Sequence, residues 1–572
     1  MDRKSIIGIA LALITLVAWE SYYAKTYRRS AVSATAGYSP ALLTGTAAPS
    51  PTATPASEPA ASPTKEIGVA EATLQAHSAS AEYTFTNLGG GISKVVLEKF
   101  LAEKKGTQVT LNEYGPAPIG AITERPGEET RAAYSVVQQN GQIVCSRTGA
   151  DQIEIVKRFT LPEANAGKDQ YLVKFDVSFT NRGSKTLQSG GYFIGLGSAA
   201  FIHHGDRSTY TGFDWYHGEK AKFIDVNWFS PRQIPLVGIQ TSAEQPFYSD
   251  SADSVLWAGV ANQYFATILS APANPGKGVW ARRFAITTPT TPLFGIEGAF
   301  GTAGFKLEPG QTHQEEFALY NGPKEYRILK QLGNEQEEIM NFNWTKPVSI
   351  FLLTAMNWLK GIFGNYVAAI LVLTICIKSV LWIPQNAATK SMKKMQALQP
   401  RMTELREKYK DDPTRMNQEL MKLYKDYGIN PFAGCLPMFI QIPIFFGFFN
   451  MLGGAVELRG SGFLWVKDLS QPDTIYTLAG YHVNLLPLLM AVTMLWQMSI
   501  TPKTGDAVQQ RIFMFVPLIF VFFCYNFASA LSLYYTVQNL FSIAQLYVTR
   551  NQQLPALQRI SAAQKKKRRG GL

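Results

Sequence analysis

The sequence of 572 residues has only four cysteines and lacks the common motifs of enzyme chemistry. Cys145, Cys376, Cys435 and Cys524 are scattered along the chain, so the sequence contains neither a disulfide framework nor the paired spacing of a zinc site. A nucleophile elbow, a phosphate-binding loop and a helical HExxH motif are also missing. We therefore expect a protein that is not an enzyme and that needs no cofactor.

Histidine is also scarce, with six residues in the chain, and one local group of them resembles a metal site. His203, His204 and Asp206 lie together, and His217 follows shortly after. Adjacent histidines on a strand point to opposite faces of the sheet, so they rarely bind one ion together. The sequence therefore predicts no metal site in this stretch.

Aspartate and glutamate are missing from five long apolar runs in the C-terminal part of the chain. Runs of about this length are typical of membrane-spanning helices. The five runs are Val367–Pro384, Cys435–Leu452, Val483–Met498, Ile512–Phe527 and Ala530–Val548. A shorter run, Ile6–Trp19, follows Arg3 and Lys4 and has the shape of a signal peptide. We interpret it as an uncleaved signal anchor, with cleavage as the alternative, and predict six transmembrane helices.

The region between the first and second predicted spans is different in character. Ser30–Lys65 is rich in Ala, Thr, Ser and Pro, which favours a flexible linker. Short β-type runs then recur between glycine-rich turns, several with alternating apolar and polar residues. The runs are Ala81–Asn87, Ile153–Leu161, Tyr171–Asn181, Tyr192–Leu196, Val255–Ile268 and Glu315–Tyr320. They predict a large, mostly antiparallel β-sandwich domain.

Two segments flank the span Val367–Pro384. Trp344–Phe363 has a broad apolar face with Lys346, Pro347 and Lys360, so we interpret it as an interfacial amphipathic helix, the alternative being an extra span.

The predicted organisation is a signal anchor at 1–29, a linker at 30–65, a β domain at 66–343, an interfacial helix at 344–365, a second transmembrane helix at 366–385, a helical hairpin at 386–429, four further transmembrane helices within 430–548, and a basic tail at 549–572.

The hairpin segment carries an apolar stripe at helical spacing. Met392, Met395, Leu398 and Met402 form the first part of this stripe, and methionine-rich surfaces suit adaptable contacts. We therefore predict that these four residues contact protein clients. Asp412-Pro413 is typical of a helix N-cap followed by proline at the first helical position, and Gly428 ends the second helix. A solvated linker with amphipathic helices is the plainer alternative.

The net charge of +12 gives the orientation in the membrane. The basic hairpin and the basic tail, with its cluster Lys565–Arg569, are separated by four predicted spans and so share one side. The positive-inside bias makes that side cytoplasmic. Both termini are then expected in the cytoplasm and the β domain in the periplasm, although Lys25, Arg28 and Arg29 beside the first span favour the opposite orientation.

Polar residues inside the predicted spans are the candidate site. Thr374, Lys378 and Gln385 lie along one face of the second span. The other candidates are Gln441 in the third span and Tyr535 and Gln538 in the last. A charge within the bilayer usually faces protein or water, and no acid in these spans can pair with Lys378. We predict a wet, positively charged groove open to the cytoplasm, against the alternative of a closed bundle joined by interhelical hydrogen bonds.

Several motifs together resemble the YidC/Oxa/Alb membrane-protein insertases, specifically the Gram-negative type, over nearly the whole chain. The motifs are Ser391–Met395 with Leu398–Pro400, Asn430-Pro431, Gly434–Pro437, Gln441–Phe445, Leu533–Tyr535 with Asn539, and Gln263–Ala266 in the β domain. The resemblance implies an insertase and chaperone of inner-membrane proteins with a periplasmic β-supersandwich. It also implies a groove with one positive residue, usually arginine. Lysine at position 378 keeps the charge without the planar fork of arginine.

The resemblance further implies nascent membrane proteins as clients and the Sec translocon (SecYEG and SecDF) as partner. The basic tail favours contact with the ribosome or with anionic lipid of the bilayer. A secondary transporter or channel with a periplasmic sensor domain is the rival class, but it usually has internal repeats and intramembrane acids, and we find neither. A periplasmic carbohydrate-binding protein on an anchor would leave five apolar runs unexplained.

Overall fold

A computed structural model describes residues 70–550 apart from 103–105, 129–131, 164–166, 204–205, 234–239, 287–292, 431–435, 479–480, 503–516 and 518. The predicted signal anchor, linker and basic cluster of the tail lie outside the described residues. Contacts divide the chain into two compact units, with the division between Ile339 and Met340. We describe each unit by itself.

The first unit is built on a nine-stranded sheet in which every pair of neighbours is antiparallel. In spatial order the strands are β13 (Ala221–Asp225), β12 (Gly212–Tyr216), β17 (Trp257–Ala261), β18 (Phe265–Ser270), β22 (Thr312–Pro323), β9 (Leu172–Asn181), β8 (Ile153–Thr160), β7 (Gln142–Thr148) and β6 (Ser135–Gln139). Alternation of buried and half-exposed side chains along β8 and β9 matches a sheet with one face on a core.

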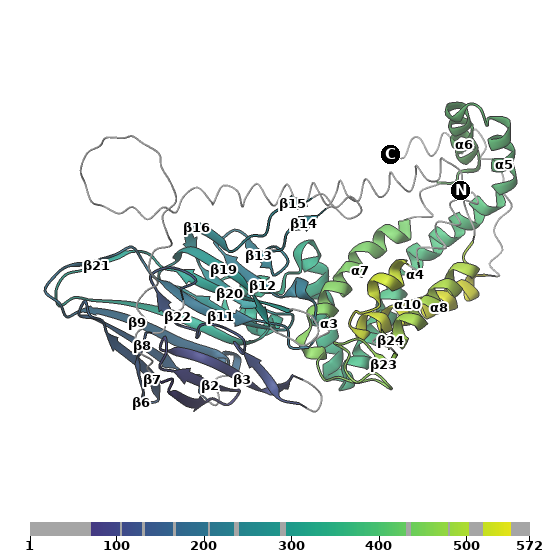
Figure 1. Ribbon diagram of the computed structural model, residues 1–572. Coiled ribbons are helices and arrows are strands. Elements are labelled where there is room, and N and C mark those ends of the chain that lie inside the picture. The colour runs from purple at the N-terminus through teal and green to yellow at the C-terminus, as the bar shows by residue number, and fades with distance from the viewer. Residues whose placement is uncertain are drawn as a thin grey trace, which may run out of the picture. The chain divides into compact units, whose positions relative to one another are not determined.

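Smaller sheets complete this β domain (Figure 1). A five-stranded sheet packs on the nine-stranded one through contacts of β11 and β20 with β17, so the domain is a sandwich, as expected. Its order is β16 (Tyr248–Val255), β19 (Gly276–Ile286), β20 (Leu293–Gly301), β11 (Phe193–Ala199) and β5 (Ile122–Thr123). A third sheet contains β1 (Thr73–His77), β2 (Ala81–Thr86), β3 (Gly91–Leu101) and β4 (Gln108–Leu111), and two short pairs are β10 (Leu187–Ser189) with β21 (Phe305–Leu307) and β14 (Arg232–Gln233) with β15 (Gln240–Ser242). A short helix, α2 (Tyr326–Leu332), follows the last strand.

One run that the sequence predicts as a single strand is divided into two strands in the structure. The apolar run Val255–Ile268 divides into β17 and β18, which pair with each other as a hairpin. Asn262 makes the turn, because its side-chain oxygen accepts hydrogen bonds from the backbone N–H of Tyr264 and Phe265, at 3.0 and 2.9 Å. This Asx-type turn begins one residue before the Gln263–Ala266 motif and overlaps it, which explains why the apolar run is interrupted there.

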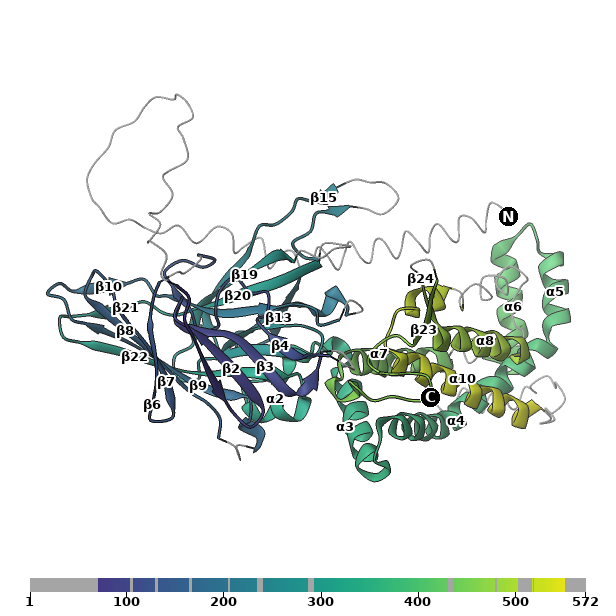
Figure 2. The same ribbon diagram turned by 60° about the horizontal axis from the view of Figure 1, so that its bottom comes forward.

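The second unit is helical (Figure 2). Its helices are α3 (Lys346–Phe363), α4 (Tyr366–Ala397), α5 (Gln399–Lys408), α6 (Pro413–Tyr427), α7 (Leu436–Gly454), α8 (Leu485–Ile500) and α10 (Ser529–Arg550), and a small hairpin of β23 (Thr474–Leu478) and β24 (Tyr481–Asn484) lies between α7 and α8. Within the described residues, α4 alone is both long and apolar enough to cross a membrane by length and composition, and α7 and α8 contain shorter apolar stretches.

Helix α4 runs through Pro384 into the hairpin segment without a break. Asn365 caps its first turn by accepting a hydrogen bond from Ala368 N–H at 2.7 Å. Beyond Pro384 the chain is rich in strong helix formers such as Ala, Lys, Met and Gln, which continue the helix to Ala397. The predicted division at residue 385 is therefore not a helix end, and the hairpin is carried on the same helix as Lys378.

Candidate functional site

Helix α4 buries Thr374 and Lys378 together with several apolar side chains, and it also exposes large apolar side chains. Lys378 is 4% exposed and Thr374 is 1% exposed, whereas Val380 and Ile383 are 75% and 78% exposed. Thr374 satisfies its hydroxyl by donating to the Ile370 carbonyl at 2.7 Å. No described residue gives Lys378 a hydrogen-bond or ion-pair partner. An inward cation on an outwardly apolar helix fits a span whose charge faces the interior of a bundle.

A second polar group joins α7 to α10. The side-chain N–H of Gln441 donates to Gln538 Oε1 at 3.1 Å and to the Tyr534 hydroxyl at 3.3 Å. Tyr534 and Gln538 are both buried. The structure thus joins two of the predicted residues, Gln441 and Gln538, through the kind of interhelical hydrogen bond that the closed-bundle alternative anticipates.

Tyr535 lies in an aromatic cluster. Its ring packs edge-on against Phe445 of α7 and against Phe520, with centroid separations of 5.4 and 5.0 Å. The neighbouring Tyr534 stacks on Phe448 at 3.9 Å. Sequence reasoning selected Tyr535, but Tyr534 makes the polar contact with Gln441, because the rotation of α10 about its axis turns that hydroxyl towards α7.

The C-terminal half of α4 contacts the end of α10. Lys393 donates to the Thr549 carbonyl at 2.7 Å, and Gln545 donates to the Trp382 carbonyl at 3.4 Å. A lysine on the last carbonyls of a helix also interacts favourably with the helix dipole. Gln385 lies between these contacts and is half-buried. These bonds fix the base of the α5–α6 hairpin against the last helix.

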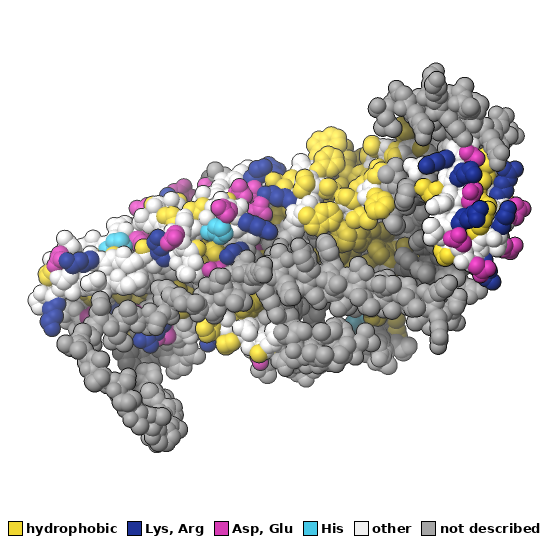
Figure 3. All heavy atoms as spheres, turned by 90° about the horizontal axis from the view of Figure 1, so that it is seen from above, with side chains coloured by type: hydrophobic (Ala, Val, Ile, Leu, Met, Phe, Trp, Pro, Cys, Tyr) yellow, Lys and Arg dark blue, Asp and Glu magenta, His cyan; other side chains and the backbone are white. Residues whose placement is uncertain are grey.

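The apolar stripe of the hairpin forms a core of its own. Met395, Leu398 and Met402 are buried with Leu420 and Ile429, and only Met392 of the four predicted contact residues is partly exposed. The outer surface of the hairpin is charged, whereas the face of the bundle shown in Figure 3 is hydrophobic. The predicted N-cap is confirmed, since Asp412 accepts from Arg415 N–H at 3.0 Å, and Gly428 ends α6 at φ +63°.

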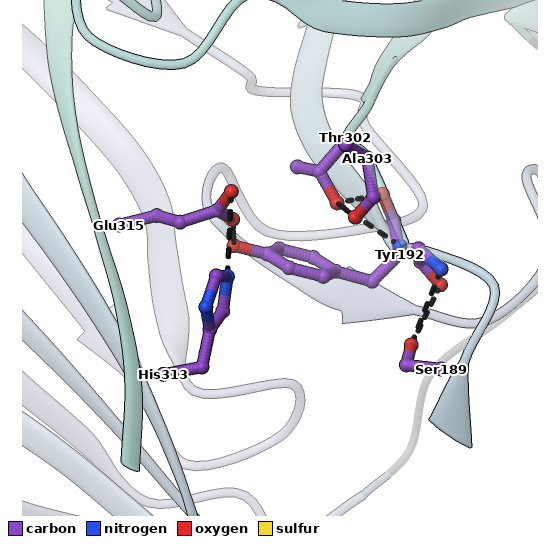
Figure 4. A network of polar contacts seen from close by, with 7 residues as sticks. Ser189, Tyr192, Thr302, Ala303, His313 and Glu315 are labelled. Atoms are coloured by element: carbon purple, nitrogen blue, oxygen red, sulfur yellow. Dashed lines mark hydrogen bonds and ion pairs between the residues drawn. The ribbon is translucent and has the colours of Figure 1, made fainter. Parts of the chain in front are cut away.

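The β domain contains a Tyr–Glu–His arrangement that sequence reasoning missed (Figure 4). The Tyr192 hydroxyl donates to Glu315, and His313 Nε2 lies 3.5 Å from the same carboxylate. Burial, with Glu315 beside it, raises the pKa of Tyr192 well above its usual range. The Tyr192 N–H also donates to Thr302 at 3.1 Å. These bonds join β11 to the end of β20 and to β22, so we assign the three side chains a structural role.

A cavity of about 170 Å³ in the β domain is lined by β4, the end of β11 and β18. Its buried amides are already used: Asn112 bonds to Ser198 N–H at 2.9 Å, and Asn262 bonds to the Ala200 carbonyl at 2.9 Å. In the histidine-rich stretch, Asp206 accepts from the backbone N–H of Ile202 and His203. Both groups of polar residues therefore shape loops.

Comparison with known proteins matches both units of the chain. The family model of the 60Kd inner membrane protein matches residues 358–556, and that of the YidC periplasmic domain matches residues 75–358. The membrane protein insertase YidC of Chlorobaculum tepidum is 29% identical over 604 residues, 99% of this chain and 98% of the relative. That of Syntrophus aciditrophicus is 40% identical over 52% of each chain. A crystal structure of an active YidC insertase aligns at 18% identity and a TM-score of 0.34, over 85% of this chain and 94% of that one.

Proposed function

The chain belongs to the YidC family of membrane protein insertases, and from this premise we propose how its own residues carry out insertion. As a member of this non-enzymatic family, it is an inner-membrane protein with a periplasmic domain and acts on nascent membrane proteins. The proposal concerns the site, the orientation of the chain and its further partners.

The proposed topology has six transmembrane helices with both termini in the cytoplasm. It rests on the basic hairpin and the basic tail, which carry the positive charge expected on the cytoplasmic side. The exposed apolar side chains of α4 support its place as the second span. Trp344, just before α3, and Trp358, within it, are both exposed, which supports an interfacial position for that helix.

The proposed mechanism rests on Lys378, which is buried and has no partner among the residues that the structure describes. A client segment with polar or acidic residues enters beside α4 and gives this cation a counter-charge within the bilayer. Thr374 lies one turn away, and Gln441 and Gln538 can exchange their mutual hydrogen bond for bonds to the client. The apolar part of the client then partitions into lipid, which drives the step. The site lowers the free-energy barrier for moving the polar residues of the client into the bilayer.

The proposed partners are the Sec translocon (SecYEG and SecDF) and the ribosome. The charged outer surface of the α5–α6 hairpin supports a first encounter with the nascent chain at the cytoplasmic side. Because Met395, Leu398 and Met402 fill the hairpin core, client contact through these residues requires the hairpin to open, whereas Met392 is accessible as it stands. The basic tail suits ribosomal RNA or anionic lipid.

Charge replacement at position 378 tests this mechanism. In cells depleted of the native insertase, Lys378→Ser is expected to slow insertion of clients with acidic translocated segments about tenfold, the equivalent of ~1.4 kcal/mol. Lys378→Arg is expected to retain insertion, because it keeps the charge. Full insertion of every client by Lys378→Ser would contradict the role of the charge.

Crosslinking locates the client more directly. Photoreactive probes at Thr374 and Met392 are expected to react with a stalled nascent chain, whereas a probe at Val380, on the exposed apolar face of α4, is the matched control. Equal crosslinking at 374 and 380 would place the client in lipid rather than beside the buried face. Ion or solute flux through purified vesicles would instead favour the alternative of a transporter or channel with a periplasmic sensor domain.

A further inference from the structure

The segment between α7 and α8, residues 455–484, exposes apolar side chains at two tips. The first tip is a tight turn in which Phe463 and Val466 exchange two backbone hydrogen bonds of 2.8 Å. Leu464 at its apex is 77% exposed, and Trp465 beside it is also exposed. The second tip is strand β23, where Ile475 is exposed and Tyr476 is 62% exposed. We call these residues the two apolar tips.

Leu464 occupies a backbone conformation that disfavours leucine. Its φ is +52°, in the left-handed region where glycine is the usual residue. The side chain gains little from the rest of the chain in return, because most of its surface is exposed. A strained residue that presents an apolar side chain outward indicates a contact outside the protein.

The tips are held on a rigid platform. Asp468 accepts hydrogen bonds from Gly460 N–H at 2.9 Å and from Ser470 N–H at 2.8 Å. The Trp465 indole N–H donates to Asp473 at 3.1 Å, so its polar edge is satisfied and its ring is available. Asn484 at the end of the hairpin donates to the Tyr525 carbonyl at 2.8 Å, which ties the segment to the turn that precedes α10.

The platform is continuous with the membrane-embedded part of the protein. It is joined directly to α7 and α8, and Asn357 of α3 donates to Glu457 at 3.5 Å. Figures 1 and 2 both place β23 and β24 at the end of the bundle opposite the α5–α6 hairpin. Neither tip can therefore lie far from the bilayer that α4 and its neighbours span.

We propose that the two apolar tips insert into the headgroup–acyl boundary of the bilayer, as an interfacial anchor beside α3. The first tip has an aliphatic apex flanked by tryptophan, and the second tip carries a tyrosine. Protein segments at the headgroup–acyl boundary typically have this composition. The residues from Gly460 to Val466 carry no charge that would oppose it. The proposal rests on the membrane topology given above and not on the mechanism at Lys378.

Site-specific fluorescence on the full-length protein in lipid nanodiscs tests the anchor. An environment-sensitive fluorescent amino acid at position 464 or 476 is expected to emit in the blue and to be quenched by lipids brominated near the glycerol end. The same probe at position 380 of α4 should be quenched most by lipids brominated deep in the acyl chains. At position 137 of the β domain, where Val137 is exposed, neither kind of brominated lipid should quench it. Emission at 464 and 476 like that at 137 would overturn the proposal.

A pair of substitutions keeps the test independent of the probe. Glycine suits the positive φ, so the Leu464→Gly variant should fold although it lacks the apolar side chain. In this variant the probe at position 476 should be quenched less by the brominated lipids than in the parent protein. Leu464→Met keeps an apolar side chain and should leave quenching at 476 unchanged. Unchanged quenching at 476 in Leu464→Gly would also contradict a shared anchor. Shielding of position 464 only after the Sec translocon is added would identify a protein contact and reject the lipid one.

Discussion

Lys157 in the β domain and Lys378 in the helical unit are both buried lysines, at 0% and 4% exposure, but their surroundings differ. Lys157 donates to the Gly89 and Gly120 carbonyls at 2.6 and 3.0 Å and lies over the Tyr134 ring at 4.3 Å. Lys378 has no partner among the described residues. The fold satisfies the ammonium of Lys157, whereas no described residue compensates the burial of Lys378, and the proposed contact with a client depends on this difference.

The same difference runs through the apolar side chains of the two units. In the β domain, large rings such as Phe159, Phe175 and Trp257 are fully buried. In the helical unit, Phe351 and Val380 are more than 60% exposed. Lipid covers such side chains as well as protein does, so the helical unit can keep its interior for polar groups.

The largest expected effect on stability comes from replacing Lys157, whose hydrogen bonds are all made within the fold. Lys157→Met should lower the free energy of unfolding of a soluble fragment spanning the β domain by about 2–4 kcal/mol, because two buried carbonyls lose their donor. Urea denaturation at pH 8 measures the change. Lys174→Met on the exposed face of β9 is the matched control and should change stability little. A stable Lys157→Met fragment would remove the contrast with Lys378.

The pH dependence of the same fragment should be the next largest effect. Burial lowers the pKa of Lys157 to about 7, below its unfolded value, so the unfolded chain binds more protons above pH 7. Stability should therefore rise from pH 7 towards pH 9, by at most ~1.4 kcal/mol per pH unit. Denaturation curves at several pH values measure the slope. The Lys157→Met fragment should lack it, and an equal slope in both would assign it to other groups.

Lys378→Met should act in the opposite direction on stability. Replacing a buried charge that no described residue compensates by an apolar side chain of similar length is expected to stabilise the helical unit by about 1 kcal/mol, a rise of roughly 2–4 °C in Tm. Thermal unfolding of the full-length protein in one detergent measures it, with Val380→Met on the exposed face as control. A clear fall in Tm would show that Lys378 has a structural partner.

The smallest expected effect concerns the bond between α7 and α10. Gln441→Leu should destabilise the helical unit by only ~0.6 kcal/mol, since interhelical hydrogen bonds in membranes contribute little on average. Thermal unfolding should show a small shift beside Phe439→Leu, an exposed position on the same helix. A much larger loss would make the bundle a closed structure and weaken the proposal that this bond opens for clients.

Local features of the sequence determined much of the fold. Alternation predicted β8 and β9 within a residue or two, and the Asp412-Pro413 pair with Gly428 predicted the bounds of α6, because caps and turns depend on neighbours in the chain. The sequence by itself also showed that Lys378 has no acid within the predicted spans to pair with.

Tertiary structure decided what packs against what. Only the fold shows that Asn262 turns the chain between β17 and β18, that Tyr534 rather than Tyr535 bonds Gln441, and that the methionine stripe fills the hairpin core. Periodicity gives the face on which a side chain lies but not the partner of that face, since the partner depends on how helices rotate and which segments meet. The exposure of Leu464 at a positive φ was decided at this level too.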